Sequence, residues 1–184
     1  MNNPHGIIVF GANGSGKTTI GRELARILNY KRMDSEDYYF KEPIGSEIPY
    51  TNSRSRDEVI KLMLDDIEKY RTFVISTVKG DLGDKITQFY KLAVHITVPF
   101  EIRMQRVRQR DIDKYGERVL KSGDMYEQEQ KYYDFLANRD LSIIDEWAKT
   151  LMCPVIQVDG TVDWRKNAAD IAEQFMSIIK YDTP

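Results

Sequence analysis

The stretch Gly11–Thr18 has the sequence GANGSGKT, with the spacing Gly-x-x-x-x-Gly-Lys-Thr of a phosphate-binding loop. Its glycines let successive backbone N–H groups converge on an anion, and a following helix would present its positive N-terminus to the same place. In this pattern Lys17 reaches the β- and γ-phosphates, and the Thr18 hydroxyl binds Mg²⁺. The stretch therefore predicts a nucleotide triphosphate site formed by Gly11, Ala12, Asn13, Gly14, Ser15, Gly16, Lys17, Thr18 and Thr19.

An acidic cluster, Asp34, Glu36 and Asp37, follows the next apolar run of the chain. Phosphoryl transfer needs a carboxylate to orient the acceptor hydroxyl or take its proton, and another to hold Mg²⁺ through water. We expect Asp34, which directly ends a strand, to lie nearest to Thr18 and the metal. Glu36 and Asp37 should lie toward the acceptor, and the sequence leaves open which carboxylate is the base. The alternative is a solvated turn that caps the next helix.

Four further residues predict where an acceptor molecule binds. Arg54 and Arg56 stand at the start of a predicted helix, where the helix dipole disfavours a cation that holds no anion. Lys79 and Gly80 follow a predicted strand and offer a cation and a backbone N–H group. We expect an acceptor-binding lobe over residues 37–70. Exposed arginines and a plain turn are the alternative interpretations of these positions.

Arginines at helical spacing follow the fourth apolar run. Arg103, Arg106 and Arg110 fall on one face of a predicted helix. Such a cluster can neutralise charge on a transferring phosphoryl group and stack a guanidinium on adenine. We therefore assign Arg106 and Arg110 to the nucleotide, and Arg110 to catalysis with Lys17. The polar stretch 108–125 predicts a lid that closes to exclude water.

Alternating apolar runs and helical patterns predict an α/β fold: a five-stranded parallel sheet with helices on both faces. Ligands of such folds collect at the carboxyl ends of the strands. There the turn after the last strand would offer its backbone to an adenine, through Asp159, Gly160 and Thr161. The predicted strands cover 6–10, 30–33, 73–76, 93–98 and 155–158. The predicted helices cover 17–29, 56–70, 84–91, 100–111, about 125–150 and 163–180.

Composition narrows the class of protein. The 184 residues form one predicted domain, with 41% hydrophobic and 30% charged residues, which is ordinary for a globular protein. A formal net charge of −2 gives no electrostatic argument for nucleic acid or an anionic membrane as a partner. No apolar run approaches the roughly 18 residues of a membrane span, and we expect a cytoplasmic location. The lone Cys153 is predicted to be a buried, apolar thiol.

Two function classes remain after several are excluded. The chain has no Asn-Lys-x-Asp segment for guanine recognition, and no apolar strand ends in the Asp-Glu pair of ATP-driven motors and transporters. The first hypothesis is an enzyme that moves the γ-phosphate of Mg·ATP to a hydroxyl or phosphate of a small molecule. The alternative is an ATP-binding regulatory module or an ATPase without an acceptor. The acceptor and the oligomeric state stay open.

The chain also resembles the nucleoside- and nucleotide-kinase group of P-loop proteins, which includes adenylate, shikimate and gluconate kinases. GANGSGKT matches their phosphate loop, and VDGT is similar to their adenine-side loop. Pro99-x-Glu101-x4-Arg106-x3-Arg110 resembles the segment by which adenylate kinases enter their lid. That similarity implies that Arg106 stacks on adenine and that Arg110 reaches the phosphates.

Two acceptor-side segments carry the rest of this resemblance. MDSED is similar to the Asp-x-Asp segment of shikimate kinases, which implies that Asp34 lies near Mg²⁺ and Glu36 near the acceptor. STVKG stands where that family has its glycine-rich acceptor loop. The resemblance further implies the strand order 2-3-1-4-5, a mobile lid and an acceptor lobe.

Overall fold

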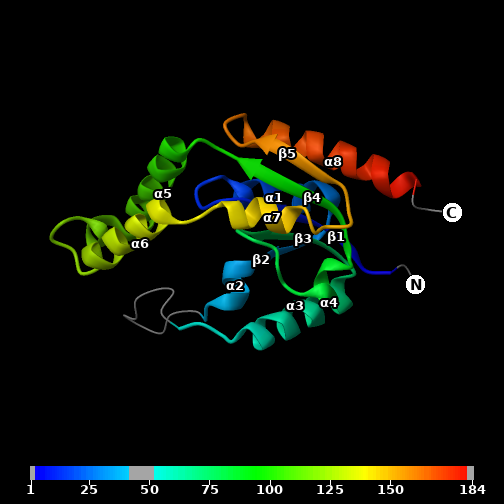
Figure 1. The fold of residues 1–184 in the computed structure, drawn as a ribbon, viewed down its shortest axis with the longest axis horizontal. Helices are drawn as coiled ribbons and strands as arrows, with labels where there is room; N and C mark the ends of the chain where they lie inside the picture. The colour runs from blue at the N-terminus through cyan, green and yellow to red at the C-terminus, as the bar shows by residue number, and fades with distance from the viewer. Residues whose placement is uncertain (1–2, 42–51, 182–184) are drawn as a thin grey trace.

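Five parallel strands form one sheet in the computed structural model, which describes residues 3–41 and 52–181 (Figure 1). Their order across the sheet is β2-β3-β1-β4-β5, as the resemblance implied, and each neighbouring pair is parallel. The α/β class with a five-stranded parallel sheet is therefore confirmed. The strands are β1 (His5–Phe10), β2 (Lys31–Asp34), β3 (Thr72–Thr77), β4 (Tyr90–Thr97) and β5 (Val155–Asp159).

The central strand β1 is apolar on both sides, because helices cover both faces of the sheet. Its side chains alternate: Ile8 and Phe10 belong to one core cluster, and Ile7 and Val9 to the other. Helices α1 (Lys17–Leu28) and α8 (Trp164–Tyr181) complete the second cluster on one face. The opposite face is covered by α3 (Arg56–Tyr70), α4 (Asp84–Thr87) and α7 (Ser142–Ala148).

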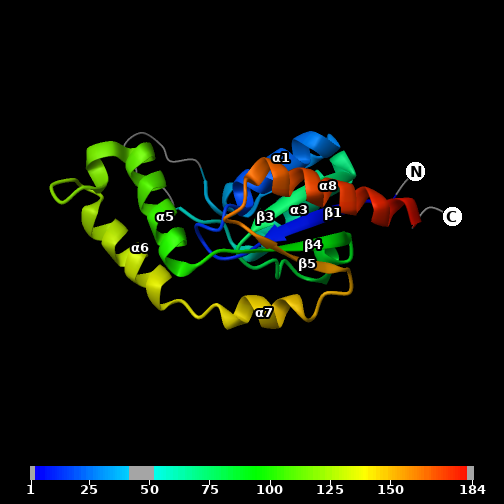
Figure 2. The same ribbon diagram turned by 90° about the horizontal axis from the view of Figure 1, so that it is seen from above.

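A helical hairpin extends from the carboxyl edge of the sheet, away from both core layers (Figure 2). It consists of α5 (Phe100–Tyr115), the short 3₁₀ helix η1 (Gly116–Val119) and α6 (Tyr126–Asn138). A separate apolar cluster of Met104, Val107, Tyr133 and Leu136 joins α5 to α6. The segment 108–125, which the sequence predicts as a lid, is the outer part of this hairpin.

Two predicted helices differ from the observed ones. The helix expected over 84–91 ends at Thr87, because Tyr90 and Leu92 already pair with β1 as the first part of β4. The stretch expected to be helical from about 125 to 150 contains two helices, α6 and α7. The Asp140 side chain accepts a hydrogen bond from the backbone N–H of Ser142 at 2.9 Å, which closes a local turn in place of a helical turn. This break lets α6 pack on α5 while α7 packs on the sheet.

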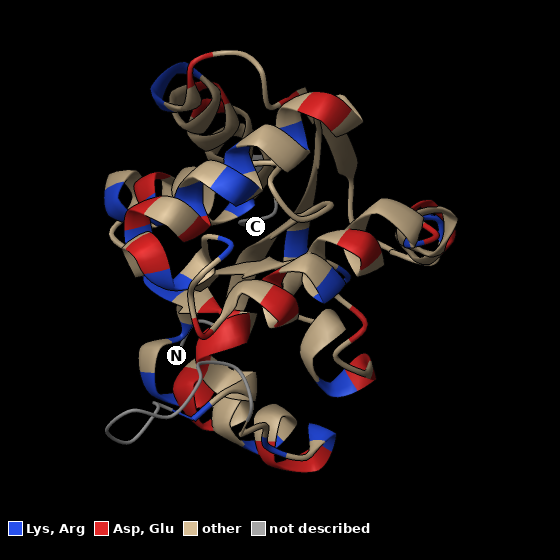
Figure 3. Cartoon of the chain, turned by 90° about the vertical axis from the view of Figure 1, so that its left-hand side faces the viewer, with Lys and Arg blue, Asp and Glu red and all other residues tan. Residues whose placement is uncertain are grey.

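Charges are mixed on the side of the molecule that carries the hairpin. Lys and Arg residues are interspersed with Asp and Glu over this side of the described chain (Figure 3). Among the helices of residues 3–41 and 52–181, no membrane-spanning candidate is found, since each is too short or too polar.

Candidate functional site

The loop between β1 and α1 has a backbone that its glycines make possible. Gly14 has φ +80° and Gly16 has φ +94°, a region that other residues rarely adopt. A Cβ on Gly14 would also lie 2.4 Å from the carbonyl oxygen of Arg103, so no side chain fits there. Helix α1 begins at Lys17, directly after this turn, so that its first backbone N–H groups face the loop.

The loop fits a nucleotide phosphate chain by three observations. A cavity of about 240 Å³ opens over it, lined by Gly14, Gly16, Lys17, Thr18, Thr19, Arg106, Val107 and Arg110. The Ser15 hydroxyl is buried without a hydrogen-bond partner among the described residues. The N-terminus of α1 and several cations face this space, and none of the lining residues is acidic. The surroundings therefore suit a polyanion.

Lys17 is the cation of the phosphate loop, and its side chain is buried. Burial lowers the pKa of its ammonium group, while the negative charges of Glu36 and Asp34 oppose this shift. Arg110 and Arg139 repel the same ammonium group. Three cations therefore converge on one space beside two carboxylates. This arrangement would hold a highly charged ligand.

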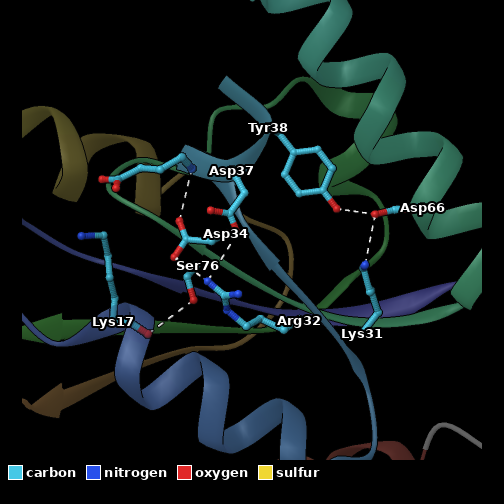
Figure 4. A network of polar contacts seen from close by, with 9 residues as sticks. Lys17, Lys31, Arg32, Asp34, Asp37, Tyr38, Asp66 and Ser76 are labelled. Atoms are coloured by element: carbon cyan, nitrogen blue, oxygen red, sulfur yellow. Dashed lines mark hydrogen bonds and ion pairs between the residues drawn. The ribbon is translucent and has the colours of Figure 1, made fainter. Parts of the chain in front are cut away.

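The three predicted acidic residues do not all face that space (Figure 4). Asp34 ends β2 next to Ser76 of β3, is buried, and caps helix α2 (Ser35–Tyr39) by accepting from the Glu36 N–H at 3.2 Å. Glu36 lies close enough to interact with Lys17. The Asp37 side chain is 63% exposed and pairs with Arg32 at 3.4 Å. Arg32 also lies 3.7 Å from the Asp34 carboxylate, so Asp37 and Asp34 share one guanidinium, while Glu36 is the one that lines the cavity beside the loop.

The α5 arginines have different partners although they share a helix face. Arg103 donates from Nη1 to the Asn13 carbonyl at 3.3 Å and from Nε to the Val98 carbonyl at 3.2 Å, so it holds the loop against α5. Arg106 and Arg110, one and two turns further on, line the cavity over the loop. The two arginines assigned to the nucleotide are therefore brought to the loop, while Arg103 has a structural role.

The predicted adenine-side turn lies against the phosphate loop. A Cβ on Gly160 would lie 2.6 Å from the carbonyl oxygen of Ser15, so the two loops touch. Arg106 donates from Nη1 to the Gly160 carbonyl at 3.0 Å. Asp159 closes the turn by accepting from the Thr161 N–H at 2.8 Å and from its hydroxyl at 2.7 Å. The phosphate loop and the turn after the last strand, which are distant in the sequence, are thus joined.

The predicted acceptor residues are mostly held by protein groups. Arg54 donates to the carbonyl oxygens of Tyr38 and Phe40, at 2.9 and 3.2 Å, and so ties α2 to the start of α3. Arg56 pairs with Asp81 at 3.4 Å, and Lys79 pairs with the same carboxylate at 3.5 Å. Their roles toward an acceptor stay predictions. Residues 42–51 of the predicted lobe lie outside the described residues.

Gly80 has a packing reason that the sequence did not reveal. A Cβ there would lie 2.1 Å from Cδ1 of Ile8 and 2.5 Å from the Trp147 ring. The loop after β3 can therefore approach α7 closely only with glycine at this position. Because no side chain fits at this position, the predicted contact with an acceptor would be made by the backbone N–H of Gly80.

A second cavity adjoins the loop. It measures about 400 Å³ and contains residues from the phosphate loop, α2, the β3–α4 loop and the hairpin. Arg139, Glu129 and Tyr132 are among the lining residues that the sequence analysis did not single out. Arg139 donates from Nη1 to Asn13 Oδ1 at 3.3 Å. The lining consists of Asn13, Glu36, Phe40, Val78, Arg110, Asp111, Tyr115, Gln128, Glu129, Tyr132 and Arg139.

No local sequence pattern marks Arg139, Glu129 and Tyr132 as functional. They lie on or directly after α6, whose apolar spacing is explained by its packing on α5. The nearest signal is Arg139 itself, a cation directly after the last turn of α6. Only the fold of the hairpin brings it to Asn13, 126 residues earlier in the chain. Tyr132 is fixed in the same way, since its hydroxyl accepts from the Asn13 side-chain amide at 3.1 Å.

Two carboxyl groups, those of Asp111 and Glu129, meet between α5 and α6. Burial raises the pKa of Glu129, and the nearby Asp111 carboxylate raises it further. Asp111 is buried, pairs with Arg110 at 2.9 Å and accepts from the Tyr133 hydroxyl at 3.3 Å. A protonated Glu129 donates a hydrogen bond to Asp111. Glu129 therefore holds its proton more tightly in the folded chain than in the unfolded one.

This shift predicts how stability depends on pH. A carboxyl pKa raised on folding favours the folded state at low pH, and the benefit is lost as pH rises from about 4.5 through the folded pKa. Glu129→Gln keeps the hydrogen-bonding shape without the charge, so we expect it to raise the free energy of unfolding at neutral pH. The difference from wild type should vanish below the unfolded pKa. Urea unfolding at a series of pH values measures it.

The matched control is Glu127→Gln, which removes an exposed carboxylate two residues away on the same helix. It should leave the pH profile of stability close to that of wild type. If Glu129→Gln and Glu127→Gln give parallel profiles at all pH values, Glu129 is not the group that titrates abnormally.

A magnesium site made by protein groups alone is not indicated. Within residues 3–41 and 52–181, no three His, Cys, Asp or Glu side chains are grouped closely enough to hold a metal ion. Mg²⁺ in phosphoryl-transfer sites uses one or two protein oxygens, with waters and phosphate oxygens for the rest. Thr18 lines the cavity over the loop, and Asp34 lies beside Lys17. These two residues suit such a site.

Comparisons with known proteins show the family of this chain. A family model described as "AAA domain" matches residues 7–134. The uncharacterized protein YqaC of Bacillus subtilis (strain 168) is 27% identical over 161 residues, which cover 83% of this chain and 87% of YqaC. A shikimate kinase of Acinetobacter baylyi is 31% identical over 111 residues, covering 54% of this chain and 59% of that enzyme.

A solved structure shows the same fold. The shikimate kinase from Acinetobacter baumannii in complex with shikimate matches with a TM-score of 0.59 and 21% identity, covering 96% of this chain and 94% of that one. The family model spans the phosphate loop, the acidic cluster and most of the hairpin. This chain therefore belongs to the P-loop family that the model describes, among proteins of the nucleotide-kinase type.

Proposed function

We propose that this protein is an ATP-dependent phosphotransferase that moves the γ-phosphoryl group of Mg·ATP to a small-molecule acceptor. The observation that carries the proposal is the position of Arg110, which lines both the cavity over the phosphate loop and the adjoining second cavity, which we name the acceptor cavity. A cation at such a junction can stabilise the negative charge of the phosphoryl group while that group is transferred from donor to acceptor. A protein that only bound ATP would not need the second cavity.

The nucleotide end of the site would be held by the loop residues Gly11–Thr19 and by Lys17 in particular. Arg106 would stack on or flank the base, because it already bridges to the turn at Gly160. Thr18 and Asp34 would hold the magnesium ion, Asp34 through water. Bound ATP would supply the phosphoryl group, whose bond to the β-phosphate oxygen breaks as the acceptor oxygen bonds to phosphorus.

The acceptor end combines a carboxylate with cations. Glu36 is a lining carboxylate close to Lys17, so it would orient an acceptor hydroxyl or take its proton. Arg139 lines the same cavity and could hold an anionic group of the acceptor. Phe40 and Tyr132 line it as well and would contact a carbon skeleton. These groups favour a small hydroxylated anion as the acceptor.

The relatives support this class without naming the acceptor. The shikimate kinases among them act, by name, on a hydroxylated carboxylate, and one was solved with shikimate bound. In this chain the acceptor loop has the sequence Thr-Val-Lys-Gly, and Asp81 neutralises both Arg56 and Lys79. From the relatives and from the lining of the acceptor cavity, we infer an acceptor related in chemistry to a hydroxy acid. Its identity is left to a screen.

The deciding experiment measures ADP release with ATP and Mg²⁺ against panels of hydroxy acids, sugars, nucleosides and nucleotides. We expect at least one hydroxylated anion to accelerate ADP release, and the phosphorylated product to appear in equal amount. Acceptor-independent ADP release at the same rate with every compound would instead indicate an ATPase. No ADP release at all with any panel member, together with tight ATP binding, would indicate a regulatory module.

The base-side role of Arg106 makes a separate prediction. Arg106→Ala should weaken ATP binding by about five- to hundredfold, since a guanidinium on a base is worth roughly 1–3 kcal/mol. The acceptor KM should change little. Calorimetric titration with ATP measures the first effect and steady-state kinetics the second. Arg108→Ala is the matched control, because Arg108 lies over the Tyr133 ring, away from the loop cavity; equal ATP affinities of the two variants would contradict the assignment.

A further inference from the structure

One residue of the phosphate loop, Asn13, belongs to both parts of the proposed site. Asn13 lines the acceptor cavity, whereas its neighbours Gly14, Gly16 and Lys17 line the cavity over the loop. Asn13 is only 9% exposed. A buried amide has to make its hydrogen bonds within the protein, because leaving one unmade costs stability. The partners of the Asn13 side chain therefore decide what this position does.

Both ends of the Asn13 amide are held by residues of the hairpin. Its Nδ2 donates to the Tyr132 hydroxyl at 3.1 Å, and its Oδ1 accepts from Arg139 Nη1 at 3.3 Å. An arginine has only donors, so the amide oxygen must face Arg139 and the amide nitrogen must face Tyr132. Tyr132 and Arg139 also line the acceptor cavity. A single side chain of the phosphate loop thus fixes two groups of this cavity.

The backbone at Asn13 is fixed to the other helix of the hairpin, α5. The Asn13 carbonyl oxygen accepts from Arg103 Nη1 at 3.3 Å. The next residue, Gly14, lies so close to the Arg103 carbonyl oxygen that no Cβ fits. Peptide groups of the same loop are those that would hold the nucleotide phosphates. The loop and both helices of the hairpin are therefore joined at this one residue.

Like charges act against the position of Arg139. The positive charge of Arg139 repels the Lys17 ammonium group and so lowers the pKa of Lys17. Arg139 also contacts the ring of Phe135, 5.6 Å from its guanidinium carbon, but Phe135 is exposed and is not among the residues that line the acceptor cavity. The Asn13 oxygen is therefore the contact that holds Arg139 at the cavity. A polyanion beside Lys17 would offset the repulsion and favour this position of Arg139.

We propose that Asn13 is a positioning residue that couples nucleotide binding to the acceptor cavity. Nucleotide phosphates order the loop backbone and attract Arg139, and the Asn13 side chain passes this order on to Tyr132 and Arg139. These two groups are then held where an anionic acceptor would meet them. ATP therefore increases the affinity for the acceptor, and the acceptor increases the affinity for ATP by the same factor. The inference rests on the nucleotide site of the proposed function.

Hydrogen–deuterium exchange measures this coupling without an acceptor and without turnover. The probe is a non-hydrolysable ATP analogue with Mg²⁺, at a concentration that saturates each variant. In the wild-type protein, we expect the analogue to slow backbone exchange in the loop, residues 11–19, and also in residues 126–139. The slowing in residues 126–139 should be about two- to tenfold, the range that one hydrogen bond provides.

Asn13→Ala removes both side-chain contacts and keeps the loop backbone. We expect the analogue still to slow exchange in residues 11–19 of this variant, but no longer in residues 126–139. Tyr132→Phe removes one of the two contacts and keeps the ring, so the slowing in residues 126–139 should fall without vanishing. Asn29→Ala is the matched control. It replaces an exposed asparagine after α1 whose φ of 55° strains an alanine, so it lowers stability away from the hairpin and should keep both wild-type responses.

Three results would contradict the inference in different ways. Slowing in the wild-type loop without slowing in residues 126–139 would show that the two parts are not coupled. A wild-type response of residues 126–139 in Asn13→Ala, or in Tyr132→Phe if Asn13→Ala does not fold, would overturn the role of Asn13. No slowing in the wild-type loop would contradict nucleotide binding itself, and with it the proposed function as well.

Discussion

Lys17→Ala should reduce acceptor-dependent ADP release by at least about a hundredfold, the loss seen when one preorganised charge is removed from a transition state. The ammonium group lies among cations and carboxylates over the phosphate loop, and burial lowers its pKa, so it is placed for a charged ligand. We expect its removal to leave the fold intact, because alanine is the best helix former and position 17 is the first residue of α1. Circular dichroism and urea unfolding check the second point.

Arg22→Ala is the matched control for Lys17→Ala. It removes a cation from the same helix at an exposed position one turn further on, away from the loop cavity. We expect it to keep wild-type turnover. If Lys17→Ala turns over ATP as fast as Arg22→Ala, the loop does not serve the reaction in the way we propose.

Asp34→Asn should cut turnover and raise the Mg²⁺ concentration needed for half-maximal rate by roughly ten- to hundredfold, the usual effect of losing an outer metal partner. The substitution is nearly isosteric. An asparagine side chain can still cap α2 by accepting from the Glu36 N–H, so the local fold should persist. The change therefore tests the negative charge and not the helix cap. A magnesium titration of the initial rate measures it.

Glu36→Gln and Asp37→Asn complete this comparison. Glu36→Gln should mainly impair acceptor use, since Glu36 lines the acceptor cavity. The sequence assigned Asp37 the same role, but its exposed side chain pairs with Arg32, so Asp37→Asn should have the smallest effect of the three. Wild-type behaviour of Asp34→Asn at every Mg²⁺ concentration would mean that the cluster is a capping turn.

Much of the fold could be predicted because its signals are local. The order of turn and helix around Gly11–Thr18 follows from glycine geometry and helix polarity within eight residues. Short apolar runs predicted all five strands to within three residues at each end, because strands buried on both faces of a parallel sheet are nearly continuous apolar runs. The helix predicted over 56–70 begins and ends where α3 does, and Ser55 starts it through a capping box with Glu58. The prediction that Cys153 is buried was less accurate, because this side chain is only partly buried in the segment before β5.

The limits of prediction appear where local and distant interactions compete. Residues 88–91 have a helical pattern, yet Tyr90 pairs with β1, and sheet hydrogen bonds decide the outcome. The α5 arginines share one face by sequence spacing. Their separate roles depend on what lies opposite each of them: the Asn13 carbonyl for Arg103, and the loop cavity for Arg106 and Arg110.

By itself, the sequence determined the phosphate loop, the α/β class and the residue types that could perform phosphoryl transfer, because each depends on contacts within a few residues. The tertiary structure alone decided which charges meet. Arg139 reaches Asn13 across 126 residues, and the Glu129 carboxyl group of α6 is brought close enough to that of Asp111 of α5 for its pKa to be raised. Such contacts depend on the path of the whole chain, which no local pattern encodes.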